Sequence, residues 1–139
     1  MKKIIIVDDN ITMLALYKAI IKQYGKDIKA EYFSDAEMAM KRVIKNSFDL
    51  IVCDVNLKHP KLDGFKIARI AYAQGKPIIF VTGTGIIKKM QFYTLYPDMI
   101  SSAKYMIKPI KSVNFIDNVN ELLARGVTSN KQMFERIIA

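Results

Sequence analysis

The 139-residue sequence contains one cysteine, one histidine and no tryptophan. The single cysteine, Cys53, excludes an internal disulfide, and it lies inside an apolar segment, where a thiol is generally inert. The single histidine, His59, leaves too few ligands for a zinc site, and we expect it to be exposed in a loop. The sequence also lacks an apolar run of about 18 residues and a signal peptide. We therefore expect a cytoplasmic protein that makes no membrane contact.

The charge of the chain is basic but dispersed. Its 22 Lys and Arg residues outnumber 13 Asp and Glu residues, which gives a formal net charge of +9. A net positive charge favours approach to anionic partners such as acidic protein surfaces. No run of five or more like charges suggests a nucleic-acid-binding tail. The sequence therefore favours an acidic protein partner over direct nucleic-acid binding.

Strand and helix patterns alternate five times along the chain. Continuous apolar runs such as Leu50 to Cys53 are typical of strands covered on both faces, as in parallel sheets. Five alternations predict an α/β fold, a parallel sheet with helices on both faces. We expect strands over residues 2–7, 28–33, 50–54, 78–82 and 103–107, and helices over residues 11–24, 34–46, 64–74 and 86–96 and from Ser112 to Gly126.

Several helix boundaries follow from local signals. Ser34 and Glu37 have the capping-box spacing, which places the start of the second helix at Ser34. Pro97 is expected to break the chain after the helix over residues 86–96. In the first helix, the residues expected to face the core by helical spacing are Met13, Leu16, Tyr17, Ile20 and Tyr24.

The length of the chain fits one domain. We expect this domain to cover residues 1–125, because Gly126 is a typical helix end. Residues 126–139 are expected to form a helical extension, with a short separate helix from Asn130, or the start of a truncated region.

Polar and charged residues follow four of the expected strands. Asp8 and Asp9 follow the first strand, Asp54 ends the third, Thr82 ends the fourth and Lys108 follows the fifth. Ligands of open α/β sheets bind at the carboxyl ends of the strands, so these residues form a candidate site. Three carboxylates in one crevice repel one another unless a cation lies among them or one is protonated. Magnesium suits such an all-oxygen set of ligands.

These residue types suit phosphoryl transfer. With Mg²⁺ bound, Asp54 is a plausible nucleophile toward phosphorus, and Lys108 supplies a second positive charge. The Thr82 hydroxyl and the backbone N–H of Gly83 are placed to bind the remaining phosphoryl oxygens. Phosphoryl transfer depends mainly on positioning and charge stabilisation, so these few groups can suffice.

The chain resembles the response-regulator receiver domain, the phospho-accepting module of two-component signalling. The resemblance spans residues 2 to about 125, and its strength lies in the order of five motifs at the ends of the expected elements. The motifs are Ile6-Val7-Asp8-Asp9-Asn10, Leu50-Ile51-Val52-Cys53-Asp54-Val55, Leu62-Asp63-Gly64, Val81-Thr82-Gly83 and Tyr105-Met106-Ile107-Lys108-Pro109.

The resemblance implies a flavodoxin-like sheet of order 2-1-3-4-5. It implies that Asp54 accepts the phosphoryl group, and that Asp9 binds Mg²⁺ directly while Asp8 acts mainly through water. The backbone carbonyl of Asn56 is implied as a further ligand.

The resemblance also implies a switch. Thr82 is the implied switch hydroxyl, Lys108 the phosphate-binding lysine, and Tyr105 the aromatic residue that follows Thr82 toward the phosphate. Lys108 and Pro109 are commonly joined by a cis peptide bond in this family. The implied protein is a signalling switch rather than an enzyme, and it catalyses only its own phosphorylation and dephosphorylation.

The implied partners are a sensor histidine kinase or a histidine phosphotransfer protein, and a downstream protein or output domain. A homodimer is also implied, through the face formed by the helix over residues 86–96, the strand over residues 103–107 and the last helix.

The sequence departs from the family near the acceptor. Pro60 and the Asp63-Gly64 pair lie two residues further from Asp54 than is usual, so two residues near Lys58 and His59 are inserted. This departure leaves open a pseudo-receiver, which binds partners independently of phosphorylation.

Two unrelated functions on the same sheet order are disfavoured. A flavoprotein would need a hydroxyl- and glycine-rich loop after the first strand, where Asp8 and Asp9 would repel the flavin phosphate. A phosphatase of the haloacid-dehalogenase type would need a second acid at Asn10.

Overall fold

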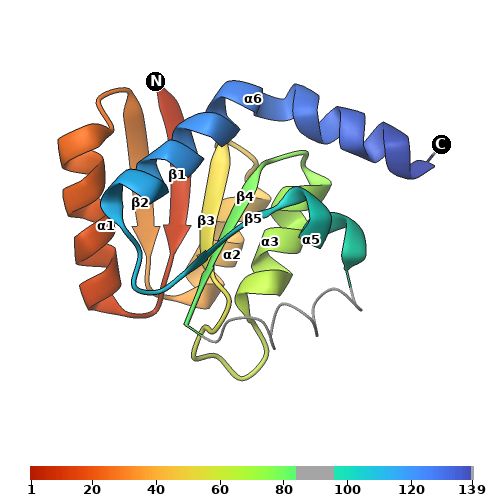
Figure 1. Cartoon of the computed structure of the whole chain (residues 1–139). Coiled ribbons are helices and arrows are strands. Elements are labelled where there is room, and N and C mark those ends of the chain that lie inside the picture. The colour runs from red at the N-terminus through yellow and green to blue at the C-terminus, as the bar shows by residue number, and fades with distance from the viewer. Residues whose placement is uncertain (84–95, 139) are drawn as a thin grey trace.

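The computed structural model describes residues 1–83 and 96–138, with side chains up to Arg125. Five strands form one parallel sheet in the order β2-β1-β3-β4-β5 (Figure 1). The strands are β1 (Lys2–Val7), β2 (Ile28–Phe33), β3 (Leu50–Asp54), β4 (Ile78–Thr82) and β5 (Lys104–Ile107). This is the flavodoxin-like α/β fold that the sequence predicted.

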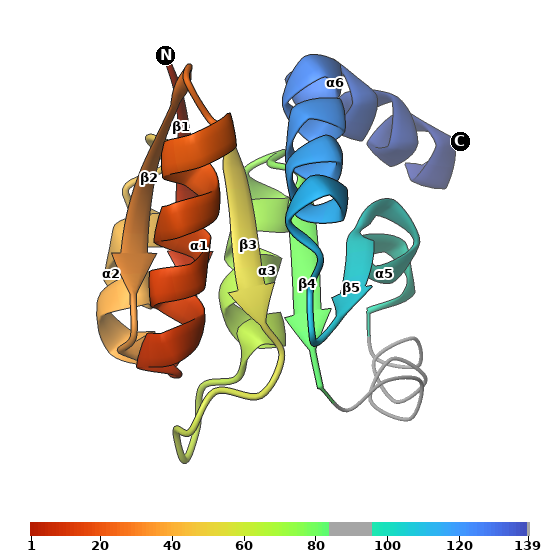
Figure 2. The same cartoon turned by 60° about the vertical axis from the view of Figure 1, so that its left-hand side comes forward.

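Helices cover both faces of the sheet. α1 and α6 lie on one face, and α2, α3 and α5 lie on the other (Figure 2). The helices are α1 (Ile11–Tyr24), α2 (Ala36–Ile44), α3 (Gly64–Ala73), α5 (Pro97–Ser102) and α6 (Ser112–Ile138). None of these described helices is long and apolar enough to cross a lipid bilayer.

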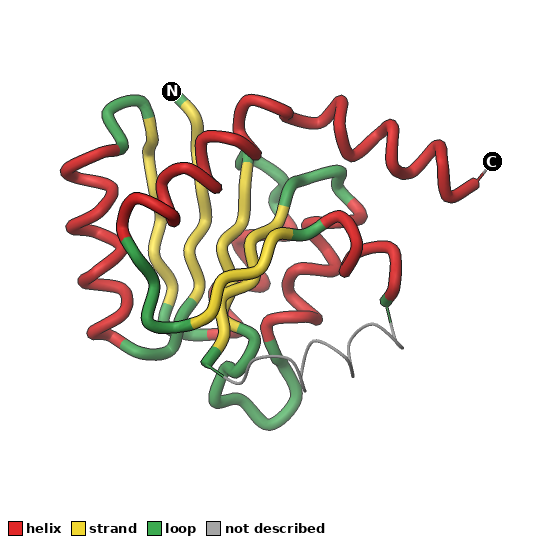
Figure 3. The backbone as a smooth tube through the Cα atoms, viewed as in Figure 1, coloured by secondary structure: helices red, strands yellow, loops and turns green. Residues whose placement is uncertain are grey.

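The two faces of the sheet explain the continuous apolar runs in the sequence. Along β1, Ile4 and Ile6 pack against α1 and α6, whereas Ile5 and Val7 pack into the cluster formed with α2 and α3. Side chains alternate between the faces of a strand, so a strand buried on both faces needs apolar residues at every position. The loops that follow β1, β3 and β5 gather at one end of the sheet (Figure 3).

The predicted start of α2 was wrong by one residue. Asp35, not Ser34, is the N-cap, and its side chain accepts a hydrogen bond from the backbone N–H of Met38 at 3.0 Å. Both residue types cap helices well, so the spacing of Ser34 to Glu37 alone did not discriminate between them.

Pro97 begins a helix instead of only breaking one. It occupies the first position of α5, where a proline is favoured because no intrahelical partner exists for its missing N–H. The helix predicted over residues 86–96 lies almost entirely outside the described residues, which resume at Tyr96.

The last helix is longer than predicted. α6 continues through Gly126 to Ile138, so Gly126 does not end it and no separate helix begins at Asn130. A glycine inside a helix costs about 1 kcal/mol relative to alanine, which lowers stability without requiring a break. The domain boundary after residue 125 stays a prediction.

The core-facing side of α1 was predicted only in part. Tyr17 and Ile20 are buried as expected, but Leu14 and Ile21 are buried in place of Leu16 and Tyr24. The buried side of α1 is therefore rotated about the helix axis by about one residue position from the predicted side.

Removal of the observed α2 cap tests this boundary. Asp35→Ala is expected to lower the free energy of unfolding by about 1 kcal/mol, because the Met38 N–H loses its acceptor. Ser34→Ala is the matched control and is expected to change it by less than about 0.5 kcal/mol. Urea denaturation of the two variants measures both values, and a larger loss in Ser34→Ala would contradict the assignment.

Candidate functional site

The parallel register brings the predicted site residues to one edge of the sheet. β1 and β3 pair in register to their carboxyl ends, so Asp8 and Asp54 are neighbours. Thr82 ends β4, and the backbone N–H of Lys108, one residue beyond β5, donates to the Thr82 carbonyl at 2.9 Å. Residues separated by up to 100 positions in the sequence therefore share one site.

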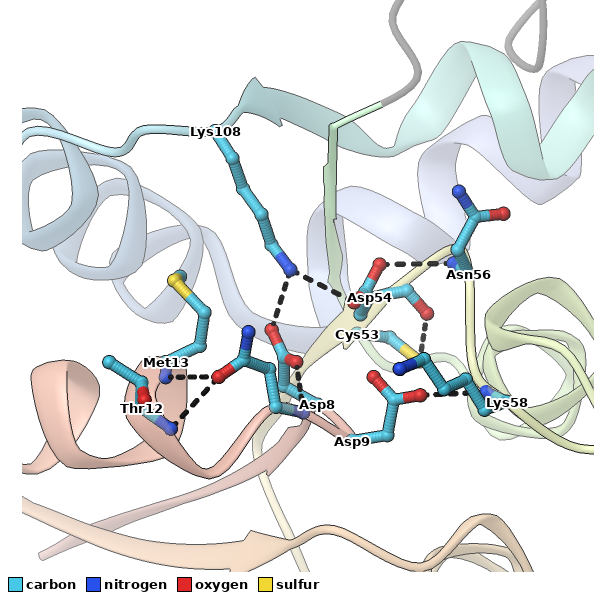
Figure 4. Close-up of polar contacts among 10 residues, drawn as sticks. Asp8, Asp9, Thr12, Met13, Cys53, Asp54, Asn56, Lys58 and Lys108 are labelled. Carbon is cyan, nitrogen blue, oxygen red and sulfur yellow. Dashed lines mark hydrogen bonds and ion pairs between the residues drawn. The ribbon is translucent and has the colours of Figure 1, made fainter.

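Asp54 is buried, and both of its carboxylate oxygens accept hydrogen bonds (Figure 4). Oδ1 accepts from the backbone N–H of Asn56 at 3.0 Å, and Oδ2 accepts from Nζ of Lys108 at 3.0 Å. An ionised carboxylate offers about four lone pairs, so each oxygen can still bind a cation or attack an electrophile. The hydrogen bonds fix the orientation of the carboxylate without using its full capacity.

Lys108 bridges two acids. Its Nζ lies 3.0 Å from Oδ2 of Asp8 and 3.0 Å from Oδ2 of Asp54. Burial alone lowers the pKa of Lys108, but the hydrogen bonds and negative charges of Asp54 and Asp8 outweigh burial and raise this pKa. The side chain is therefore an ammonium group at neutral pH.

Asp54 experiences the opposite balance. Burial raises the pKa of its carboxyl group, and the negative charge of Asp8 raises it further. The hydrogen bonds from Lys108 and Asn56 lower the pKa but do not cancel the effect of burial. Burial therefore destabilises the ionised form of Asp54 in the folded protein, and the hydrogen bond from Lys108 offsets this destabilisation only in part.

Asp8, Asp9 and Asp54 form a compact acidic cluster. Each offers one oxygen, and these oxygens all lie within 4.8 Å of one another. Among the residues that the structure describes, Lys108 is the cation paired with these acids, and its one positive charge is smaller than the charge of three ionised carboxylates. The cluster presents oxygen donors and no nitrogen or sulfur, which is the donor set that suits Mg²⁺. Its chemistry therefore fits a hard divalent cation.

Asp9 is bound by the loop that follows β3. Its Oδ2 accepts a hydrogen bond from the backbone N–H of Lys58 at 2.8 Å, as Figure 4 shows. Lys58 lies where the sequence predicts a two-residue insertion beside the site. The hydrogen bond from this loop to Asp9 is the detail that the sequence did not predict.

The predicted switch residues lie on neighbouring strands. Thr82 is buried at the end of β4, and the Tyr105 ring on β5 packs against Phe80 with ring centroids 5.5 Å apart. Gly83 follows Thr82, and a Cβ atom added there would meet no atom of the described residues within 4 Å. The roles of Thr82, Tyr105 and Gly83 stay predictions, as does metal binding by the carbonyl of Asn56.

The peptide bond between Lys108 and Pro109 is cis, as the resemblance implied.

The Cys53 thiol is buried, and burial together with the charge of Asp54 raises its pKa well above the usual value. The thiol is therefore uncharged at neutral pH and is not a nucleophile.

Gly64 supports Asp54 and was not predicted as a site residue. A Cβ atom at Gly64 would lie 1.9 Å from the backbone oxygen of Asp54, and the Gly64 N–H donates to the Val55 carbonyl at 3.1 Å. No side chain fits between the start of α3 and the end of β3. The Leu62-Asp63-Gly64 motif carried this signal, because a glycine is required where two backbones approach closely.

The model of the response regulator receiver domain family matches residues 4–120 of the chain. The chain belongs to this family. This membership agrees with the motifs of the sequence, which place acids, a hydroxyl and a lysine at the carboxyl edge of the sheet.

Curated response regulators are similar to this receiver domain. It is 31% identical over 122 residues to the transcriptional regulatory protein RprY of Bacteroides fragilis, a match that covers 85% of this chain and 47% of RprY. It is 31% identical over 127 residues to the alkaline phosphatase synthesis transcriptional regulatory protein PhoP of Bacillus subtilis, covering 90% of this chain and 50% of PhoP. The chain thus spans about half the length of these relatives.

Solved receiver structures share the fold. A CheY-like receiver domain protein from Methanospirillum hungatei superposes with a TM-score of 0.74 at 23% identity, covering 90% of this chain and 95% of that one. The receiver domain of a sensor histidine kinase from Pseudomonas aeruginosa, solved with a magnesium ion coordinated in its active site cleft, superposes with a TM-score of 0.71 at 20% identity, covering 88% and 98%.

Neutralising Asp54 is expected to stabilise the protein. The raised pKa of Asp54 means that the folded state binds this proton more tightly than the unfolded state, so stability falls as the pH rises through the interval between the two pKa values. Asp54→Asn removes that loss and is expected to raise the free energy of unfolding at pH 7 by about 0.5–2 kcal/mol. Urea denaturation in Mg²⁺-free buffer measures the change.

The matched control is Asp117→Asn, an exposed acid on α6. It is expected to change the free energy of unfolding by less than about 0.5 kcal/mol. A marked destabilisation by Asp54→Asn would show that the hydrogen bonds to Asp54 outweigh the cost of its burial.

A second variant tests the close approach at Gly64. Gly64→Ala is expected to lower the free energy of unfolding by about 1–3 kcal/mol, because the backbone of Asp54 must shift to admit the Cβ atom. Gly83→Ala, whose added Cβ meets no described residue within 4 Å, is the control for stability. Equal melting temperatures of the two variants would refute the argument.

Proposed function

We propose that the receiver domain is a phosphorylation switch whose acceptor is Asp54. The observation that carries this proposal is the environment of the Asp54 carboxylate. It is buried at the end of β3, bound by Lys108 through one oxygen, and part of a cluster of three acids in the described part of the chain. A carboxylate held in this way is oriented as a nucleophile and lies beside groups that bind anionic oxygens.

The proposed reaction transfers a phosphoryl group to Asp54. A carboxylate oxygen of Asp54 attacks phosphorus and forms an acyl phosphate, while the bond from phosphorus to the donor breaks and the leaving group takes its electron pair. Lys108 stabilises the charge on the phosphoryl oxygens, and the Thr82 hydroxyl and Gly83 N–H donate hydrogen bonds to them.

Asp8, Asp9, Asp54 and the backbone carbonyl of Asn56 are the residues that would hold Mg²⁺. When bound, Mg²⁺ supplies positive charge that orients the phosphoryl group and neutralises it. Lys108 already balances one of the three acids, so a divalent cation brings the cluster to neutrality.

Phosphorylation is proposed to shift a pre-existing equilibrium. The Thr82 hydroxyl turns toward the phosphoryl group, and the Tyr105 ring follows into the space that Thr82 leaves. This movement changes the surface formed by β5 and α6, where Ile107 and Val113 are exposed apolar residues. The predicted third part of this surface, over residues 86–96, lies almost wholly outside the described residues.

The proposed partners follow from the switch. A sensor histidine kinase or a histidine phosphotransfer protein supplies the phosphoryl group, and a downstream protein or output domain reads the changed surface. A homodimer through the same surface is part of the proposal. The domain acts as a signalling switch, and the only reactions assigned to it are its own phosphorylation and dephosphorylation.

Incubation with acetyl phosphate and Mg²⁺, followed by intact-protein mass spectrometry, tests the acceptor. The wild type is expected to gain one phosphoryl group, and Asp54→Asn is expected to gain none because its amide is not a nucleophile. Asp49→Asn is the matched control, since Asp49 precedes the opposite end of β3, and it is expected to be phosphorylated like the wild type.

Unmodified wild-type protein under excess donor would contradict the switch. Continued binding of a partner by that unmodified protein would support the pseudo-receiver, which acts through constitutive contacts. The complete set of acids and the paired lysine favour the phosphorylated switch.

A further inference from the structure

The loop between β3 and α3 makes a hydrogen bond to the acidic cluster. It covers residues 55–63 and contains the insertion near Lys58 and His59. Leu57 is buried in the core, and the Gly64 N–H bonds to the Val55 carbonyl. Both ends of the loop are therefore anchored independently of its inserted middle.

The middle of the loop reaches the acidic cluster through its backbone. The N–H of Lys58 donates to Oδ2 of Asp9 at 2.8 Å across 49 residues of sequence (Figure 4). A backbone N–H has a fixed direction once its loop is fixed. The orientation of the Asp9 carboxylate therefore depends on what holds the loop in this shape.

His59 holds the loop in this shape. Its Nδ1 accepts hydrogen bonds from the backbone N–H groups of Lys61 at 3.0 Å and Leu62 at 2.9 Å. Two donors at Nδ1 require that the neutral imidazole carry its hydrogen on Nε2. Nε2 lies 3.2 Å from Oε1 of Glu37 on α2. His59 is half-buried, so the expectation of a simply exposed histidine was wrong.

The same local geometry occurs at Asn10 in the first loop. Its Oδ1 accepts from the N–H groups two and three residues later, at 2.9 and 3.2 Å. His59 makes the same pair of bonds with a ring nitrogen, again to the residues two and three positions later. An asparagine at position 59 can thus reproduce the turn but cannot reach Glu37 in the same way.

We propose that His59 is a positioning residue that orients Asp9 for Mg²⁺ through the backbone of Lys58. His59 closes the turn after Lys58, the closed turn holds the Lys58 N–H on one oxygen of Asp9, and the other oxygen remains directed to the cluster. This inference rests on the proposed function and deepens it. Groups that hydrogen-bond a metal ligand directly commonly change metal affinity by about 10–100-fold when removed, and His59 acts on Asp9 one step further away, so its effect is expected at the lower end of this range.

The contact with Glu37 has a smaller part in this arrangement. The Glu37 side chain is 67% exposed, and exposed ion pairs contribute little because water screens them. The two hydrogen bonds accepted by Nδ1 lie within the loop itself. They close the turn after Lys58, and the His59 N–H, which donates to the Leu57 carbonyl at 2.9 Å, joins this turn to the buried Leu57 on the other side of Lys58.

Titration of the wild type and three variants with Mg²⁺ tests the inference, with the dissociation constant read from backbone amide shifts in NMR spectra. His59→Ala is expected to weaken Mg²⁺ binding by roughly tenfold, since Asp9 loses its fixed orientation. His59→Asn is expected to recover most of this loss, and Glu37→Gln is expected to match the wild type. If the imidazole ring only filled space, His59→Asn would bind Mg²⁺ as weakly as His59→Ala.

Hydrogen exchange of the Lys58 amide in Mg²⁺-free buffer provides a second readout. Exchange is expected to accelerate in His59→Ala and to return toward the wild-type rate in His59→Asn. Melting temperatures of the same proteins separate loosening of the loop from unfolding of the domain.

Unchanged or tighter Mg²⁺ binding in His59→Ala would overturn the inference. Failure of the wild type to bind Mg²⁺ would count against the proposed function instead. In that case the exchange of the Lys58 amide still decides the role of His59, because an unaltered rate in His59→Ala would overturn it without reference to the metal.

Discussion

Repulsion between carboxylates that cannot move apart is the constraint on which the receiver site depends. Asp8 and Asp54 follow paired positions of neighbouring parallel strands, so the register of the sheet fixes their separation. Lys108 lies 3.0 Å from both and neutralises part of the charge. The remaining negative charge disfavours the folded protein in the absence of a cation, and it is the feature on which the proposed Mg²⁺ site rests.

The rest of the structure restrains these charges. The core on both faces of the sheet buries β1, β3 and β4, and Asp8, Asp54 and Thr82 lie at the ends of these strands. Backbone N–H groups of the following loops then bind the acids. Asp8 and Asp54 each accept an N–H from two residues later, at 2.9 and 3.0 Å, and Asp9 accepts one from Lys58. The strands therefore set the positions of the acids, and the loop N–H groups set the orientations of their carboxylates.

Most of the fold followed from patterns with a single physical meaning. Runs that are apolar at every position require a strand covered on both faces, and the bounds of β1, α1 and β4 agree with the prediction. The errors lie where two outcomes have similar free energies. Asp35 and Ser34 are comparable caps, Pro97 is compatible with both a break and a helix start, and Gly126 costs too little to end a helix that other residues favour.

The sequence by itself determined the order of the elements and, through the family motifs, the residues that meet at the carboxyl edge of the sheet, because the carboxyl ends of parallel strands lie at one edge. Only the tertiary structure decided how the inserted loop lies. The bond from Lys58 to Asp9 joins residues 49 positions apart. The contact of His59 with Glu37 joins two separate elements. Such contacts depend on the path of the chain through space, and no local propensity encodes that path.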